Sequence, residues 1–91
     1  MTKTMKADGL DKAIIGITDG SFDTNIRLVY DIDKCIKILM DRDGMDREEA
    51  LEFFTFNISG AYVGEGTPIF MWKMTLKEME DADIIYSEAN H

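Results

Sequence analysis

Two helices joined by a turn at Gly44 are predicted in the middle of the sequence, and this pair constrains the fold most strongly. The apolar residues of the first helix recur with the spacing of one helical face, and they are Ile32, Ile36, Leu39 and Met40. Asp31 or Asp33 can cap its start, and Gly44 can end it in the left-handed conformation. Asp46, followed three residues later by Glu49, is a capping-box pattern that opens the second helix. So short a link predicts an αα-hairpin.

Three short apolar segments flank the hairpin and predict a sheet. Residues 13–18 and 26–30 are rich in β-branched residues and predict two strands, and residues 69–72 form a near-continuous apolar run. The Gly-rich stretch from Ser59 to Pro68 ends the second helix. Thr75 with Glu78 forms another capping box, which opens a last helix to about Tyr86.

These elements predict one α+β domain over residues 1–91, in the order β-β-α-α-β-α. The expected architecture is a small three-stranded sheet on which the αα-hairpin and the C-terminal helix pack. Residues 1–8 are polar and are expected to fray. The second helix is expected to bury one face, which consists of Ala50, Phe53, Phe54, Asn57 and Ala61. The aromatic run that includes Phe56 is assigned mostly to the core.

The charge balance restricts the class of partner. The chain has 18 Asp and Glu against 10 Lys and Arg, a formal net charge of −8. This balance argues against direct nucleic-acid binding and favours a basic partner protein, although it also serves solubility. The acids concentrate in residues 41–52 and 78–88. If both clusters share one surface, the expected contact residues are Glu78, Glu80, Asp81 and Asp83, followed by Asp43, Asp46, Glu48 and Glu49.

Signatures of catalysis, cofactors and membranes are missing from the sequence. A single Cys excludes a disulfide framework, and Cys35 is expected to be buried and inert beside an apolar helical stripe. The apolar runs are too short to span a bilayer, and there is no secretory signal, so we expect a cytoplasmic protein. Asp19, Asp23, Asp31 and Asp33 could together attract Mg²⁺, but strand-end and cap positions explain them without a metal. We therefore expect no enzyme, no cofactor and no metal site.

The segment between the second helix and the third strand is a candidate for a small pocket. Asn57 is expected on the apolar face, where its amide needs partners, and it can serve to fix the backbone of the loop. The functional alternative is a recognition pocket built from Asn57, Tyr62, Glu65 and Thr67. A contact within a homo-oligomer is the third alternative.

Two sequence blocks carry a resemblance to a family. The first is the segment Val29-Tyr30-Asp31-Ile32-Asp33-Lys34-Cys35-Ile36-Lys37-Ile38-Leu39, followed by Asp43-Gly44-Met45 and Glu48-Glu49-Ala50. The second is the segment from Phe56 to Phe70, Phe-Asn-Ile-Ser-Gly-Ala-Tyr-Val-Gly-Glu-Gly-Thr-Pro-Ile-Phe. They resemble short, uncharacterised proteins of phages and bacteria. The resemblance implies an accessory protein of a mobile element in the cytoplasm of a host cell, and it implies no activity.

We therefore expect a small acidic, non-enzymatic accessory protein. It would bind and block a host or defence protein, in particular one that binds nucleic acid, through electrostatic steering and apolar contacts. The alternative is a binder of a small, nucleotide-like molecule that uses residues 57–68.

Overall fold

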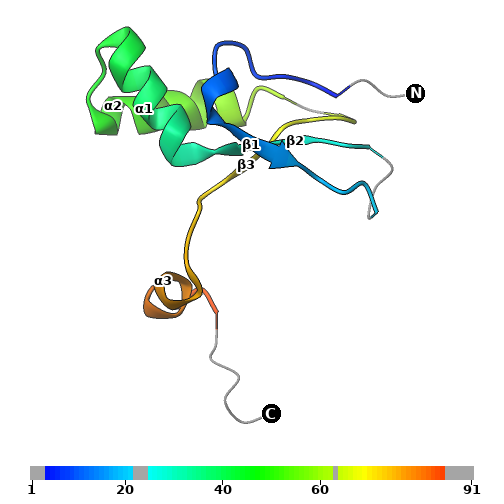
Figure 1. Ribbon diagram of the computed structural model, residues 1–91. Helices are drawn as coiled ribbons and strands as arrows, with labels where there is room; N and C mark the ends of the chain where they lie inside the picture. The colour runs from blue at the N-terminus through cyan, green and yellow to red at the C-terminus, as the bar shows by residue number, and fades with distance from the viewer. Residues whose placement is uncertain (1–3, 22–24, 63, 86–91) are drawn as a thin grey trace.

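The computed structural model describes residues 4–21, 25–62 and 64–85 of the chain. Its elements follow the predicted α+β order (Figure 1). The strands are β1 (Ile14–Ile17), β2 (Leu28–Asp31) and β3 (Ile69–Met71), and the α-helices are α1 (Ile32–Asp43), α2 (Arg47–Phe53) and α3 (Leu76–Asp81). A 3-10 helix, η1 (Asp11–Ala13), precedes β1, and a π-helix, η2 (Phe54–Ser59), continues α2.

The three strands form one mixed sheet in the order β1-β2-β3. β1 and β2 are antiparallel, with a bulge between Ile14 and Gly16. β3 is parallel to β2, so the chain must cross over between them, and α1, α2 and η2 make that connection. In the register, Tyr30 lies between Ile14 and Phe70, and this row faces the core. Successive side chains alternate between faces, so Val29 and its neighbours face the opposite side.

The first helix of the hairpin begins and ends where the sequence predicts, and the second begins where it predicts. The Asp31 side chain caps α1 by accepting a hydrogen bond from the backbone of the first turn. Gly44 follows α1 with a φ of 69°, in the left-handed region that favours glycine. Asp46 and Glu49 form the predicted capping box of α2. The buried face of α1 consists of Ile32, Cys35, Ile36 and Leu39.

Aromatic rings join the sheet to the hairpin. The ring centroid of Phe70 lies 5.3 Å from that of Tyr30 and 5.1 Å from that of Phe54, with the second pair edge to face. Such pairs contribute about 0.5–1.5 kcal/mol beyond the area they bury. The core that surrounds them includes Leu10, Ala13, Cys35, Ile36, Leu39 and Ala50.

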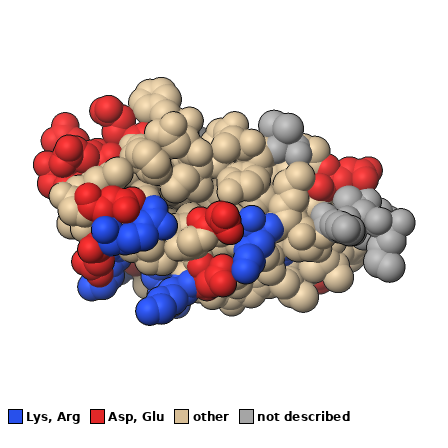
Figure 2. Space-filling view, turned by 90° about the horizontal axis from the view of Figure 1, so that it is seen from above, with Lys and Arg blue, Asp and Glu red and all other residues tan. Residues whose placement is uncertain are grey.

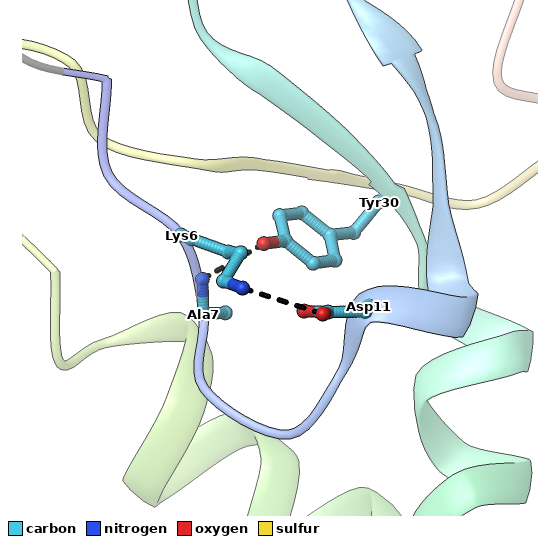
Figure 3. Close-up of polar contacts among 4 residues, drawn as sticks. All are labelled: Lys6, Ala7, Asp11 and Tyr30. Atoms are coloured by element: carbon cyan, nitrogen blue, oxygen red, sulfur yellow. Dashed lines mark hydrogen bonds and ion pairs between the residues drawn. The ribbon is translucent and has the colours of Figure 1, made fainter.

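The N-terminal segment is part of the core, and the expectation that residues 1–8 fray is wrong for residues 4–8. The buried Ala7 amide donates a hydrogen bond to the Tyr30 hydroxyl at 2.8 Å (Figure 3). The Met5 amide donates to the Gly66 carbonyl at 2.9 Å. Composition alone favoured fraying, whereas these two bonds tie the segment to β2 and to the turn before β3. Residues 1–3 lie outside the described residues.

The second helix does not continue as an α-helix to Ala61, as the apolar spacing predicted. It changes to the π-helix η2 after Phe53, and the hydroxyl groups of Thr55 and Ser59 donate to backbone carbonyls four residues earlier. Such back-bonding loosens or bends a helix. The wider turn changes which residues face the core. Phe54 remains buried, but Asn57 and Ala61 are exposed rather than placed on a buried face.

α3 does not pack on the sheet, in contrast to the architecture that the sequence suggested. None of its residues is buried, and Leu76 is 64% exposed. In Figure 1 the helix lies away from the sheet, at the end of an extended segment that follows β3. The helix ends at Asp81, before the predicted limit, and Tyr86 lies outside the described residues. The predicted capping box of Thr75 and Glu78 is present.

Candidate functional site

The first acidic cluster lies on the turn of the hairpin and on α2. The carboxylate of Asp43 accepts hydrogen bonds from Arg42 Nε at 3.0 Å and from Arg42 Nη2 at 2.9 Å, and this guanidinium holds the Asp43 pKa below its usual value. Asp46 and Glu49 bond each other's backbone amides in the capping box. Glu48 is exposed and forms no ion pair with any described residue.

The second acidic cluster lies on α3. Backbone and side-chain hydrogen bonds from Thr75 lower the pKa of Glu78. Asp81 pairs with Lys77 at 3.5 Å, and both side chains are well exposed, so the pair contributes little stability. Glu80 is half-buried and Asp83 is exposed just after the helix.

The structure does not bring the two clusters onto one surface. In Figure 1 the hairpin and α3 lie in different parts of the molecule, separated by the sheet and by the extended segment after β3. Figure 2 shows acidic side chains gathered at the end where the hairpin lies, and Lys and Arg along one long side with Asp and Glu among them. A partner contact at the hairpin therefore has to be argued from the first cluster alone.

A hollow of about 280 Å³ lies where α2 passes into η2, beside the first cluster. It is lined by Met45, Glu49, Glu52, Phe53, Phe56 and Asn57. Phe56 is 76% exposed, which corrects its assignment to the core. No described residue forms an ion pair with Glu52. The hollow thus combines an aromatic ring, an apolar floor and carboxylates, and this set suits the guanidinium or ammonium group of a partner.

The π-helix explains why Phe56 and Asn57 reach this hollow. Continuous α-helical spacing places Asn57 on the buried face with Phe53, whereas the observed backbone places Phe54 inside and the next residues outward. π-helical turns often occur at functional sites. The signal in the sequence is the pair of hydroxyl residues, Thr55 and Ser59, spaced for back-bonding within a helix rich in aromatic and β-branched residues.

The four loop residues proposed as a pocket have different surroundings. Asn57 lines the hollow on η2, and Glu65 is exposed. Tyr62 packs against the core. The Thr67 hydroxyl donates a hydrogen bond to the Gly64 carbonyl, within its own turn. Tyr62 and Thr67 therefore have structural contacts that account for them.

A groove between η1 and α1 gathers positive side chains that the sequence analysis missed. One hollow of about 530 Å³ is lined by Gly9, Asp11, Lys12, Ile38, Asp41 and Arg42. An adjoining hollow of about 320 Å³ is lined by Lys12, Lys34, Lys37, Ile38 and Asp41. The sequence signal was the spacing of Lys34, Lys37 and Asp41 along one helical face. Lys12, however, comes from another element, and its neighbourhood follows only from the fold.

Cys35 and the acidic residues give no sign of a reactive centre. Cys35 is fully buried, and burial, together with the nearby Asp31 carboxylate, raises its pKa to about 11. Within residues 4–21, 25–62 and 64–85, no group of three His, Cys, Asp or Glu side chains could hold a metal ion. Asp23, one of the four acids considered for Mg²⁺, lies outside these residues, as does Glu88 of the second cluster.

Comparisons with known proteins leave the function open. No family model, curated protein or solved structure matched the chain. The resemblance to short phage and bacterial proteins therefore stays a prediction. In the described part of the chain, no helix is both long and apolar enough to cross a membrane.

Proposed function

We propose that this chain is a non-enzymatic protein-binding module whose α2–η2 surface captures a basic partner. The α2–η2 surface consists of Met45, Glu48, Glu49, Glu52, Phe53, Phe56 and Asn57. One observation carries the proposal: Phe56 is largely exposed at the rim of a hollow that also contains two glutamates. An exposed ring of this size beside carboxylates is suited to contact with another molecule.

The chemistry of the hollow favours an arginine of the partner. A guanidinium can lie on the face of Phe56 while it donates hydrogen bonds to the Glu52 carboxylate. Arginine and aromatic residues are also the side chains that most often dominate the affinity of protein interfaces. Met45 and Phe53 supply the apolar floor against which the aliphatic part of such a side chain can pack.

The remaining acids of the hairpin have a second role in this proposal. Asp46 and Glu48 are exposed at the start of α2 and, together with Asp43, whose charge Arg42 partly offsets, they accelerate encounter with a positive surface. The acids of α3 add to this attraction but lie on a separate part of the molecule. A nucleic-acid-binding protein presents a suitable basic surface, and occupation of that surface would block it. In biological terms, we propose that the chain is a phage-type accessory protein that inhibits a host or defence protein.

The experiment compares variants for binding to a panel of purified basic nucleic-acid-binding proteins, with an arginine-rich peptide as the minimal probe. We expect Phe56→Ala to weaken binding about tenfold, because truncation of an aromatic anchor costs 1 kcal/mol or more. Trp72→Ala is the matched control, since it removes an exposed aromatic residue outside the hollow. Its affinity should match that of the parent protein.

A comparison of two charge reversals distinguishes binding at the hollow from general electrostatic attraction. Glu52→Lys and Glu80→Lys change the net charge equally, but only Glu52 lines the hollow. We expect Glu52→Lys to accelerate dissociation, and Glu80→Lys to change only the association rate and its salt dependence. A larger loss of affinity in Glu80→Lys than in Glu52→Lys would indicate that the partner contacts α3. Unchanged binding by Phe56→Ala would refute the proposed surface.

A further inference from the structure

The groove between η1 and α1 gathers four cationic side chains in a molecule that is acidic as a whole. Lys12 comes from η1, and Lys34, Lys37 and Arg42 come from one exposed face of α1. The two adjoining hollows share Lys12, Ile38 and Asp41, so they form one continuous groove. Their volumes of about 530 and 320 Å³ match the size of sites that bind small molecules.

Gly9 and Asp43 determine the position of the Arg42 side chain in this groove. Asp43 accepts hydrogen bonds from Nε and Nη2 of the guanidinium, and this two-bond pair fixes its plane. The third nitrogen, Nη1, lies against Gly9. A Cβ atom added to Gly9, which has a φ of +79°, would be only 2.7 Å from Nη1. The guanidinium therefore approaches the backbone at residue 9 through Nη1, and a side chain there would displace it.

The groove also contains groups that are not positive, among them Asp11, whose carboxylate pairs with Lys6. Ile38 is half-buried and provides an apolar wall. Asp41 is exposed in both hollows and forms no ion pair with any described residue. A carboxylate of this kind accepts hydrogen bonds from hydroxyl or amino groups and repels a ligand that consists only of phosphate.

From this combination we infer that the η1–α1 groove binds a phosphorylated small molecule of the nucleotide class. Lys12, Lys34 and Lys37 neutralise the phosphates. Ile38 and the plane of the Arg42 guanidinium cover the base, because guanidinium groups stack well on aromatic rings. Asp41 accepts hydrogen bonds from ribose hydroxyl or base amino groups.

The charge distribution favours a small ligand over a nucleic-acid chain. Arg42 lies in the last turn of α1, and the exposed acids Asp46 and Glu48 follow at the start of α2, where they repel a long polyanion. The net charge of −8 also disfavours binding of a long polyanion. A ligand with two or three negative charges fits within the groove and avoids this repulsion. The inference does not depend on the α2–η2 surface, because the two sites share no lining residue.

The test is calorimetric titration of the full chain with ADP, AMP, adenosine and inorganic phosphate. We expect ADP to bind more tightly than AMP, and both to bind more tightly than adenosine or inorganic phosphate. We expect Lys34→Glu/Lys37→Glu to weaken ADP binding at least about tenfold, since each substitution replaces an attraction to phosphate with a repulsion. Circular dichroism establishes that the variant is folded.

Lys77→Glu is the control, because Lys77 is an exposed lysine on α3 outside the groove. It should bind ADP within about twofold of the parent protein, a change expected from net charge alone. Equal loss of binding in Lys77→Glu would overturn the inference, as would ADP binding that survives in the double variant. Equal affinity for ADP and inorganic phosphate would overturn the assignment to nucleotides, and no ADP binding at millimolar concentration would overturn it entirely.

Discussion

Tyr30 connects the N-terminal segment, the sheet and the hairpin through a single side chain. Its ring packs on Phe70, and its hydroxyl accepts the hydrogen bond of the Ala7 amide (Figure 3). Lys6, next to Ala7, pairs with Asp11 at 3.3 Å, but both side chains are exposed and the pair adds little. The buried bond to Tyr30, together with the bond from the Met5 amide to the Gly66 carbonyl, therefore fixes this segment.

Tyr30→Phe is expected to destabilise the protein through that bond. The ring remains, but the buried Ala7 amide loses its acceptor, so the free energy of unfolding should fall by about 1–3 kcal/mol. Urea unfolding measures the change, and hydrogen exchange should show that the Ala7 amide loses protection. Tyr62→Phe is the control for removal of a hydroxyl from a less buried tyrosine. Equal stability of Tyr30→Phe and the parent would show that the bond contributes nothing.

The buried thiol of Cys35 predicts a loss of stability at alkaline pH. Burial raises its pKa from 9.0 to about 11, so the folded state binds the thiol proton more tightly than the unfolded state. This contribution is fully present below pH 9 and is lost as the pH rises toward 11. The total loss is about 3 kcal/mol.

Urea unfolding under reducing conditions at several pH values tests this prediction. Cys35→Ala is the control, and its stability should decline less steeply between pH 9 and pH 11 than that of the parent. Tyr30, whose pKa is also raised by burial, contributes to the decline in both proteins, and somewhat less in the variant, because the charge of Cys35 is one of the smaller causes that raise the Tyr30 pKa. Identical slopes for the parent and the variant would contradict the prediction.

At the scale of single elements, local sequence patterns predicted where the helices begin better than they predicted helix lengths or packing partners. The capping pairs at Asp46 and Thr75 involve atoms only three residues apart, so sequence spacing is sufficient to predict them. The change from α2 to η2 was not predicted, because apolar periodicity assumes a constant helical turn. The exposure of Phe56 was missed for the same reason, and with it the hollow on which the proposed function rests.

α3 is expected to be independent of the rest of the fold. Met79→Pro removes the hydrogen bond from the Met79 amide to the Thr75 carbonyl, so α3 should be lost. Because α3 buries no residue, the free energy of unfolding should change by less than about 0.5 kcal/mol. The reference is Lys37→Pro in α1, at an exposed position of a helix with a buried face, which should cost about 3 kcal/mol or more.

Urea unfolding followed by near-ultraviolet circular dichroism distinguishes the two variants. A large loss of stability in Met79→Pro would show that α3 packs against the rest of the chain.

At the scale of the whole molecule, charges are separated in a way that composition does not reveal. The net charge of −8 drew attention to the acidic clusters, yet the η1–α1 groove brings Lys12 beside Lys34 and Lys37. The spacing of Lys34 and Lys37 on one helical face is a local pattern, whereas the approach of Lys12 depends on the packing of η1 against α1. The position of α3 is also a property of the fold. The chain has a radius of gyration of 15.3 Å, against about 12 Å for a compact domain of this length.

The parallel pairing of β2 and β3 has a consequence for the order in which a newly made chain can fold. β2 leaves the ribosome first, but its partner follows only after the whole helical connection has been synthesised. During that interval the ring of Tyr30 lacks the ring of Phe70, and one edge of β2 has no hydrogen-bonding neighbour. Translation products that stop within α2 therefore expose an open strand and an unfilled core, the features that chaperones and proteases recognise.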